Sequence, residues 1–168
     1  MRKDKMMELL HELLKNSKKS DRNLAKTLNC SQPTITRMRK RLEKMGFISE
    51  YTIIPNLVKM GFEIAAYTFM NISQYGEKGG ASSKRLAERA HKWILENPKI
   101  VFASPIEGPG GKNCMMVTMH KNFTDFSEFI SDFRSKWPKN IKDIETFIAP
   151  AGSRVIKPFS FRYLEKVK

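Results

Sequence analysis

Short helical stripes of apolar side chains, separated by polar breaks, fill the first 46 residues. The first stripe runs from Asp4 to about Asn16, and its apolar positions recur three and four residues apart, as on one face of a helix. After the break at Ser17-Lys18-Lys19, a shorter helix is predicted from Asp21 to Leu28, with Ser20 as its N-cap. The apolar positions of the first stripe are Met6, Leu9, Leu10, Leu13 and Leu14.

A third helix is predicted to begin at Ser31, which offers another N-cap, and to end at Gly46. Pro33 lies in its first turn, where proline is tolerated. Asn29-Cys30 forms the tight turn before this helix. Two short helices joined by such a turn form a helix-turn-helix, whose second helix packs on the first and presents its far side to the DNA major groove.

The third helix has an apolar face and a basic face. At 100° per residue, Ile35, Met38, Leu42 and Met45 gather on the side expected in the core. Arg39 lies beside this face, where its stem is expected to snorkel. Cations and small polar residues gather opposite, as a recognition helix requires, although a solvated basic helix remains the alternative. The candidate DNA-binding residues are Ser20, Ser31, Gln32, Thr34, Thr36, Arg37, Lys40, Arg41 and Lys44.

These candidates divide by the part of DNA that each can meet. Gln32, Thr36 and Arg37 are predicted to reach base edges. The cations of the basic face, Arg37 included, are predicted to meet phosphates, together with Ser20.

Strands alternate with helices from residue 62 onward. Strands are predicted at 62–72, 100–106, 114–119 and 144–149, helices at 84–96 and from the cap Thr124 onward, and an extended segment at 155–163. The order βαββαβ is that of a ferredoxin-like unit, in which both helices cover one face of the sheet. The fold class is therefore α+β, with a helix-turn-helix domain at residues 1–60 and a ferredoxin-like domain at residues 61–168.

The predicted strands carry large apolar side chains on both faces. In the first strand, Phe62, Ile64 and Met70 share one parity, whereas Tyr67 and Phe69 have the other. A sheet covered on one face alone should alternate apolar and polar residues. The second face therefore needs a cover that this chain does not supply, which predicts an obligate homodimer with its sheets packed face to face. The alternative is a crowded edge or a wrong strand assignment.

Charge favours an anionic partner. Lys and Arg number 31 against 17 Asp and Glu, a net charge of +14, and residues 1–60 hold 14 of these cations against 6 acids. Nucleic acid is the first expectation and an anionic membrane surface the second. No uncharged apolar stretch approaches 18 residues, so no membrane span is predicted. Cys30 and Cys114 cannot make a disulfide framework, which favours a reducing cytoplasm.

One set of N-terminal motifs stands out: Leu24-Ala25-Lys26, Cys30-Ser31, Thr34-Ile35, Arg37, Arg41-Leu42-Glu43, Gly46-Phe47-Ile48 and Tyr51. These motifs resemble the winged helix-turn-helix of the Lrp/AsnC, or feast/famine, transcriptional regulators. The resemblance covers residues 9–61, and one departure is that Met38 and Arg39 exchange the family's usual aliphatic and basic positions. It implies that residues 47–54 form a strand pairing between two subunits, and that the second domain is an effector-binding domain whose dimers associate further, often into octamers.

A glycine-rich turn is the candidate effector site. Family members bind a free amino acid near such a turn with a glycine followed closely by an aspartate, and Gly108 matches the glycine. The aspartate is absent, and Asn113 stands nearest its place, where a neutral amide pairs more weakly with an ammonium group. A plain hairpin turn is the alternative. The candidate effector residues are Gly108, Gly110, Gly111 and Asn113.

Other candidate chemistry is sparse. His11, His91 and His120 match no metal-ligand spacing, neither cysteine has a Cys or His at motif distance, and the loop at residues 73–83 lacks phosphate-binding spacings. No catalytic residue, metal or cofactor is predicted. The sequence thus predicts a cytoplasmic, sequence-specific regulator that binds double-stranded DNA and is modulated by a small-molecule effector such as an amino acid. The alternatives are a siroheme-decarboxylase-like enzyme and an effector-independent DNA-compacting protein.

Overall fold

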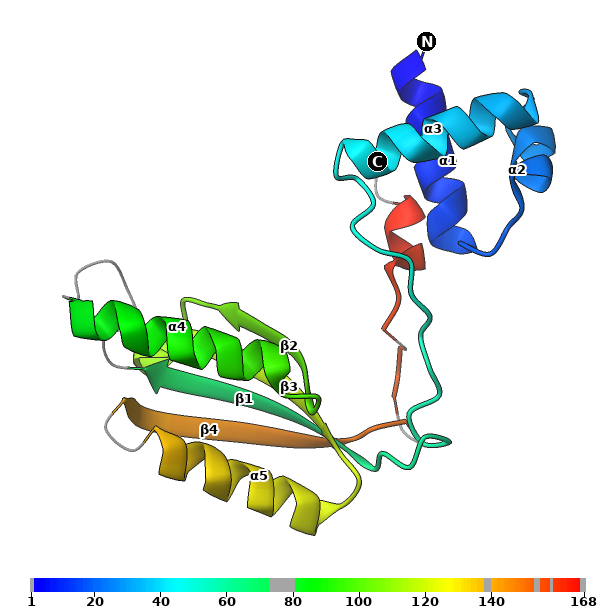
Figure 1. The fold of residues 1–168 in the computed structure, drawn as a ribbon. Coiled ribbons are helices and arrows are strands. Elements are labelled where there is room, and N and C mark those ends of the chain that lie inside the picture. The colour runs from blue at the N-terminus through cyan, green and yellow to red at the C-terminus, as the bar shows by residue number, and fades with distance from the viewer. Residues whose placement is uncertain (1, 73–80, 138–139, 153–154, 158, 167–168) are drawn as a thin grey trace. The chain divides into compact units, whose positions relative to one another are not determined.

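The computed structural model describes residues 2–72, 81–137, 140–152, 155–157 and 159–166. Within these ranges the chain forms two compact units, residues 1–54 with 157–168, and residues 55–156 (Figure 1). The elements of the first unit are α1 (Arg2–Lys15), α2 (Asp21–Thr27), α3 (Gln32–Lys44) and the 3-10 helix η2 (Phe161–Lys166). Those of the second are β1 (Ile64–Ile72), α4 (Ala81–Glu96), β2 (Ile100–Pro105), the 3-10 helix η1 (Pro109–Gly111), β3 (Cys114–His120), α5 (Phe123–Lys136) and β4 (Ile141–Pro150).

The three N-terminal helices begin and end within about two residues of the predicted bounds. Ser20 and Ser31 cap α2 and α3, and each accepts a hydrogen bond from the backbone N–H three residues on. Gly46, with φ of +74°, follows the end of α3. Asn29, with φ of +49°, turns the chain between α2 and α3. The core of this unit joins all three helices through Met6, Leu9, Leu13, Leu24, Ala25, Leu28, Ile35 and Leu42.

The C-terminal segment lies with the first unit, whereas the sequence predicts it in the second domain. η2 packs against α1, which also contacts α3. The extended conformation expected for residues 155–163 therefore gives way to a 3-10 helix from Phe161 onward. Residues 157–168 add four cations and one acid, so this unit holds a net charge of +10 out of +14.

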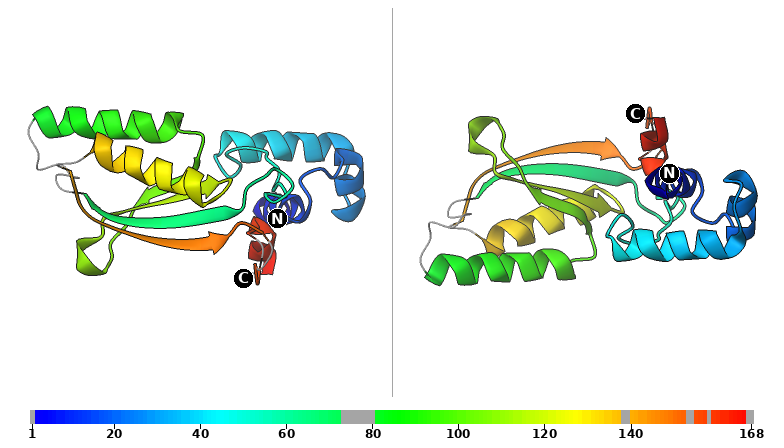
Figure 2. Two further views of the ribbon diagram at one scale, coloured as in Figure 1. Left: turned by 90° about the horizontal axis from the view of Figure 1, so that it is seen from below. Right: turned by 90° about the horizontal axis from the view of Figure 1, so that it is seen from above.

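The second unit has the predicted βαββαβ order. Its four strands pair in the order β2-β3-β1-β4, and every pair is antiparallel. Both helices lie over one face of the sheet (Figure 2). Alternate residues of β1 and β3 point to this face and are buried, and Trp93 of α4 stacks on Phe133 of α5 with ring centroids 5.4 Å apart. The sheet and the helices share a core of Met70, Cys114, Met116, Phe129, Phe133 and Trp137.

Two local expectations are wrong and a third stays a prediction. Residues 47–54 have no regular secondary structure in the single chain, and the strand implied there is one that pairs two subunits. Asn122, and not Thr124, caps α5, since its side chain accepts a hydrogen bond from the N–H of Asp125. Met45, expected in the core, is 51% exposed because α3 has already ended there. Most of the predicted loop at 73–83 lies outside the described residues.

Candidate nucleic-acid interface

The outward face of α3 carries four exposed cations, Arg37, Lys40, Arg41 and Lys44. None of them forms an ion pair within the described ranges. Their charges are therefore free to meet phosphates, and the buried Ile35 and Leu42 hold the opposite face of the helix in the core.

The N-terminus of α3 presents small polar groups. The Ser31 hydroxyl lies 2.8 Å from that of Thr34, and it also accepts the Thr34 N–H at 3.4 Å. Gln32 is exposed and has no side-chain hydrogen bond among the described residues. Gln32 and Ser31 are therefore open to solvent at the end of the helix that a recognition helix turns toward bases.

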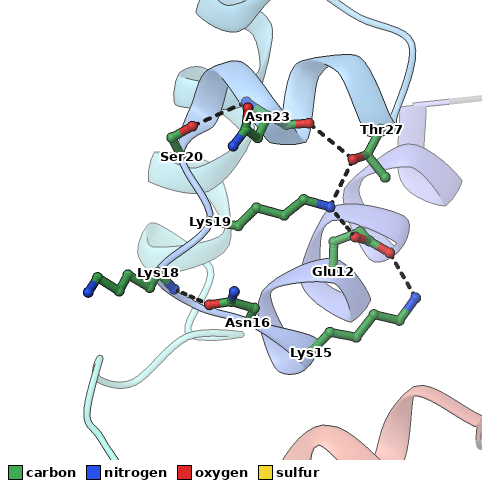
Figure 3. A network of polar contacts seen from close by, with 8 residues as sticks. All are labelled: Glu12, Lys15, Asn16, Lys18, Lys19, Ser20, Asn23 and Thr27. Carbon is green, nitrogen blue, oxygen red and sulfur yellow. Dashed lines mark hydrogen bonds and ion pairs between the residues drawn. The ribbon is translucent and has the colours of Figure 1, made fainter.

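A polar network holds the start of α2 (Figure 3). The Lys19 ammonium donates to Glu12 of α1 at 2.9 Å and to the Thr27 hydroxyl at 2.8 Å, so it joins α1 to α2. Hydrogen bonds from Lys15 and Lys19 lower the pKa of the Glu12 carboxyl, which keeps this acid ionised. Ser20 follows Lys19 directly, and its exposed hydroxyl caps α2. The network fixes the place of Ser20, while Lys19 itself is occupied.

Thr36 does not face outward with a free hydroxyl as expected. It is half-buried, and its hydroxyl donates to the carboxylate of Asp21 in α2 at 2.7 Å. Arg39 donates to the same carboxylate twice, from Nη2 at 2.7 Å and from Nε at 3.1 Å. Arg39 is thus an ion-pairing residue between α2 and α3 and not merely a snorkelling stem, a role that sequence reasoning missed. The exchange of Met38 and Arg39 was the signal that marked this position.

The linker after α3 joins the same group of polar side chains. The Arg39 guanidinium lies over the ring of Tyr51, 5.9 Å from its centroid, and the Tyr51 hydroxyl donates to Glu43 at 2.9 Å. Burial raises the pKa of the Asp21 carboxyl, but the hydrogen bonds from Thr36 and Arg39 outweigh it, so the pKa falls below its usual value. Asp21 is therefore ionised and fully engaged.

The polar side chains next to the glycine turn of the second unit are already bonded to other groups of that unit. Both amide atoms of Asn113 bond to the backbone of Ile72, each at 2.8 Å. The Lys112 ammonium pairs with Glu145 at 2.9 Å and also with Asp143, and these hydrogen bonds raise its pKa. Three of the four candidate effector residues are glycines. Gly110 and Gly111 have positive φ, whereas Gly108 is extended.

Three further observations bear on other functions. Within the described ranges, no helix is long and apolar enough to cross a bilayer. No group of three His, Cys, Asp or Glu side chains in the same ranges could hold a metal ion. Both cysteines are free, and burial raises the pKa of the Cys114 thiol.

Comparison with known proteins places these features in a class. The MarR family model matches residues 6–52, which is the helix-turn-helix unit alone. The chain is 28% identical over 144 residues to the uncharacterized HTH-type transcriptional regulator PH0061 of Pyrococcus horikoshii, covering 84% of this chain and 88% of that protein. It is 25% identical over 130 residues to the HTH-type transcriptional regulator LrpC of Bacillus subtilis, covering 77% and 79%.

Solved structures share the fold over nearly the whole chain. The crystal structure of PH0061 aligns with a TM-score of 0.70, at 24% identity, over 92% of this chain and 96% of that one. The regulator NMB0573 of Neisseria meningitidis, solved as an L-Met complex, aligns with a TM-score of 0.74, at 16% identity, over 92% and 91%. By sequence, the chain is similar over most of its length to helix-turn-helix transcriptional regulators. Those of its relatives that are named for their type are Lrp proteins.

Proposed function

We propose that this chain regulates transcription by binding double-stranded DNA in a sequence-specific manner, with α3 as the recognition helix, and that it carries out no catalysis. The observation that supports this most directly is the set of four exposed cations on one face of α3, which lie opposite buried Ile35 and Leu42 and form no ion pair with any residue that the structure describes. The cations would neutralise phosphates, while Gln32 and Arg37 would reach base edges. The names of the relatives match neither a decarboxylase nor a DNA-compacting protein. We expect the protein to work in the cytoplasm, where its target DNA would lie.

The test of this assignment is the double variant Arg37→Ala with Lys40→Ala. Binding to a duplex selected from a random pool by the wild-type protein should weaken, and the slope of log K against log salt should fall by about 0.9 for each lost phosphate contact. The matched control is Lys92→Ala with Lys136→Ala, since both lysines lie on helices of the second unit. If the first variant binds as tightly as wild type at ordinary salt, α3 is not the recognition helix.

We propose that the chain acts as a dimer through the uncovered face of its sheet. Four side chains from four strands form a row across that face: Phe102, Val117, Tyr67 and Phe147. Tyr67, Phe102 and Phe147 are exposed in the single chain. Apolar area of this kind normally lies in an interface, and two copies packed face to face would cover it. Octamers would follow from further contacts between dimers.

For the effector, the proposed contact is the backbone of the turn at residues 108–111 and not the Asn113 side chain. Both amide atoms of Asn113 are already hydrogen-bonded, so a ligand would have to break those bonds to use them. The L-Met complex of NMB0573 makes a free amino acid the first class to test. Isothermal titration of the protein with the twenty amino acids checks this, and the absence of binding by all of them would exclude amino-acid sensing.

A further inference from the structure

Asp21 lies next to the proposed phosphate contact Ser20, and a free carboxylate there would repel DNA. It is the first residue of α2, at the end of the helix that approaches the DNA backbone in a helix-turn-helix. The structure turns this carboxylate onto α3, where Arg39 and Thr36 donate to it. In the resulting ion pair the Arg39 side chain is 18% exposed and that of Asp21 is 22% exposed. The negative charge of Asp21 is therefore compensated by Arg39, and it lies toward α3 and not toward the DNA phosphates that Ser20 would contact.

Arg39 also reaches beyond the two helices. Its guanidinium covers the ring of Tyr51 in the linker, and Tyr51 is in turn bonded to Glu43 near the end of α3. Arg39 thus contacts α2 through Asp21 and the linker through Tyr51. The guanidinium can do both at once, because two of its donors engage the carboxylate while its charge lies within cation–π distance of the ring.

We propose that Arg39 is a positioning residue for DNA recognition. It holds α2 and α3 as one rigid binding surface and neutralises Asp21 beside the phosphate path, although it does not touch DNA itself. This inference rests on the proposed function of α3. It also assigns Thr36 to the same fixed group of residues, since its hydroxyl is bound to Asp21 and is not free to read a base.

The effect of Arg39 on charge and its effect on the position of α3 can be measured separately. The charge part acts on every DNA sequence alike, because phosphates carry no sequence information. The positioning part acts on the ratio of the affinities for a selected duplex and a random one, since hydrogen bonds to base edges tolerate less displacement of α3 than contacts to phosphates, which every duplex offers. Loss of an ion pair that merely stabilised the fold would lower the free energy of unfolding and leave the ratio of affinities of the folded protein unchanged.

The experiment compares Arg39→Met with wild type on two probes, a duplex that wild type selects from a random pool and a random-sequence duplex of equal length. We expect the ratio of the two affinities to fall about tenfold, as for coupled residues in one network. Affinity for the random duplex should fall about threefold, because an unpaired carboxylate is exposed. Adding Asp21→Asn should restore the affinity for the random duplex and leave the ratio low.

Lys5→Met is the matched control, because it also removes a cation that bonds inside this unit, to the carbonyl oxygen of Leu28 at 3.1 Å, but Lys5 lies on α1. It should leave the ratio unchanged. If Arg39→Met does not fold, Arg39→Lys keeps the charge and loses the planar fork, and the ratio should still fall. An unchanged ratio in a folded Arg39 variant, or an equal fall in Lys5→Met, would overturn the inference. Failure of wild type to select any duplex would instead overturn the proposed function.

Discussion

Replacing Phe147 with alanine should break the proposed dimer. Phe147 lies on the uncovered face of the sheet, directly opposite Tyr67 on the neighbouring strand, and it is 62% exposed in the single chain. With roughly 200 Å² for an aromatic side chain, burying that fraction covers roughly 120 Å² and contributes about 3 kcal/mol in each chain at 25 cal/mol per Å². Two chains lose about 6 kcal/mol, and even half of this raises the dissociation constant more than about a hundredfold.

Sedimentation equilibrium over a range of protein concentrations measures this change. Phe123→Ala is the matched control, because Phe123 is 63% exposed but lies on α5, away from the open sheet face. Each phenylalanine also has one aromatic neighbour at 5.9 Å, so the two variants lose similar contacts within the chain. If wild type is monomeric at all concentrations, or if both variants weaken the dimer equally, the argument from the open face is wrong.

Three further predictions concern stability, each measured by urea unfolding. Burial lowers the pKa of His120, so below about pH 6.5 the unfolded chain binds a proton at this side chain while the folded chain keeps it neutral. The free energy of unfolding should therefore fall as the pH drops below about 6.5, and His120→Gln should make that fall less steep. Gly111→Ala should lower the free energy of unfolding by about 1–2 kcal/mol, because φ is +71° there and the new Cβ would lie 2.8 Å from the side-chain amide nitrogen of Asn71. Gly108→Ala should lower it much less, because Gly108 has an extended backbone and its new Cβ would lie 3.5 Å from the nearest atom. Leu42→Ala should cost about 2–5 kcal/mol and the exposed Met45→Ala under about 1 kcal/mol; equal costs would contradict the placement of Met45 outside the core.

The helix-turn-helix could be predicted from sequence because its signals are local. Ser20 and Ser31 cap their helices through contacts three residues away, and Gly46 ends α3 through its own backbone. The apolar spacing of α3 then set which face is buried, and Ile35 and Leu42 confirm it. Met45 failed because periodicity continues past the end of a helix, whereas the helix itself does not.

The polar contacts could not be predicted in the same way. Arg39 and Asp21 are 18 residues apart, and no rule of spacing shows that the tight turn brings them within hydrogen-bond distance. Asn113 likewise meets Ile72 across 41 residues through the pairing of β1 with β3. The sequence showed only that Arg39 was unusual and that Asn113 stood in place of an acid; what each residue binds follows from tertiary structure.

The dimer and the recognition helix are linked through binding strength. Two half-sites on one duplex bind a dimer far more tightly than a monomer, because the second head binds at the high effective concentration set by the first. Phe147→Ala should therefore weaken DNA binding although Phe147 lies outside the DNA-binding unit. Raising the protein concentration above the new dissociation constant should recover the lost affinity. The loss of specificity in Arg39→Met should persist at any concentration, because it originates within a single head.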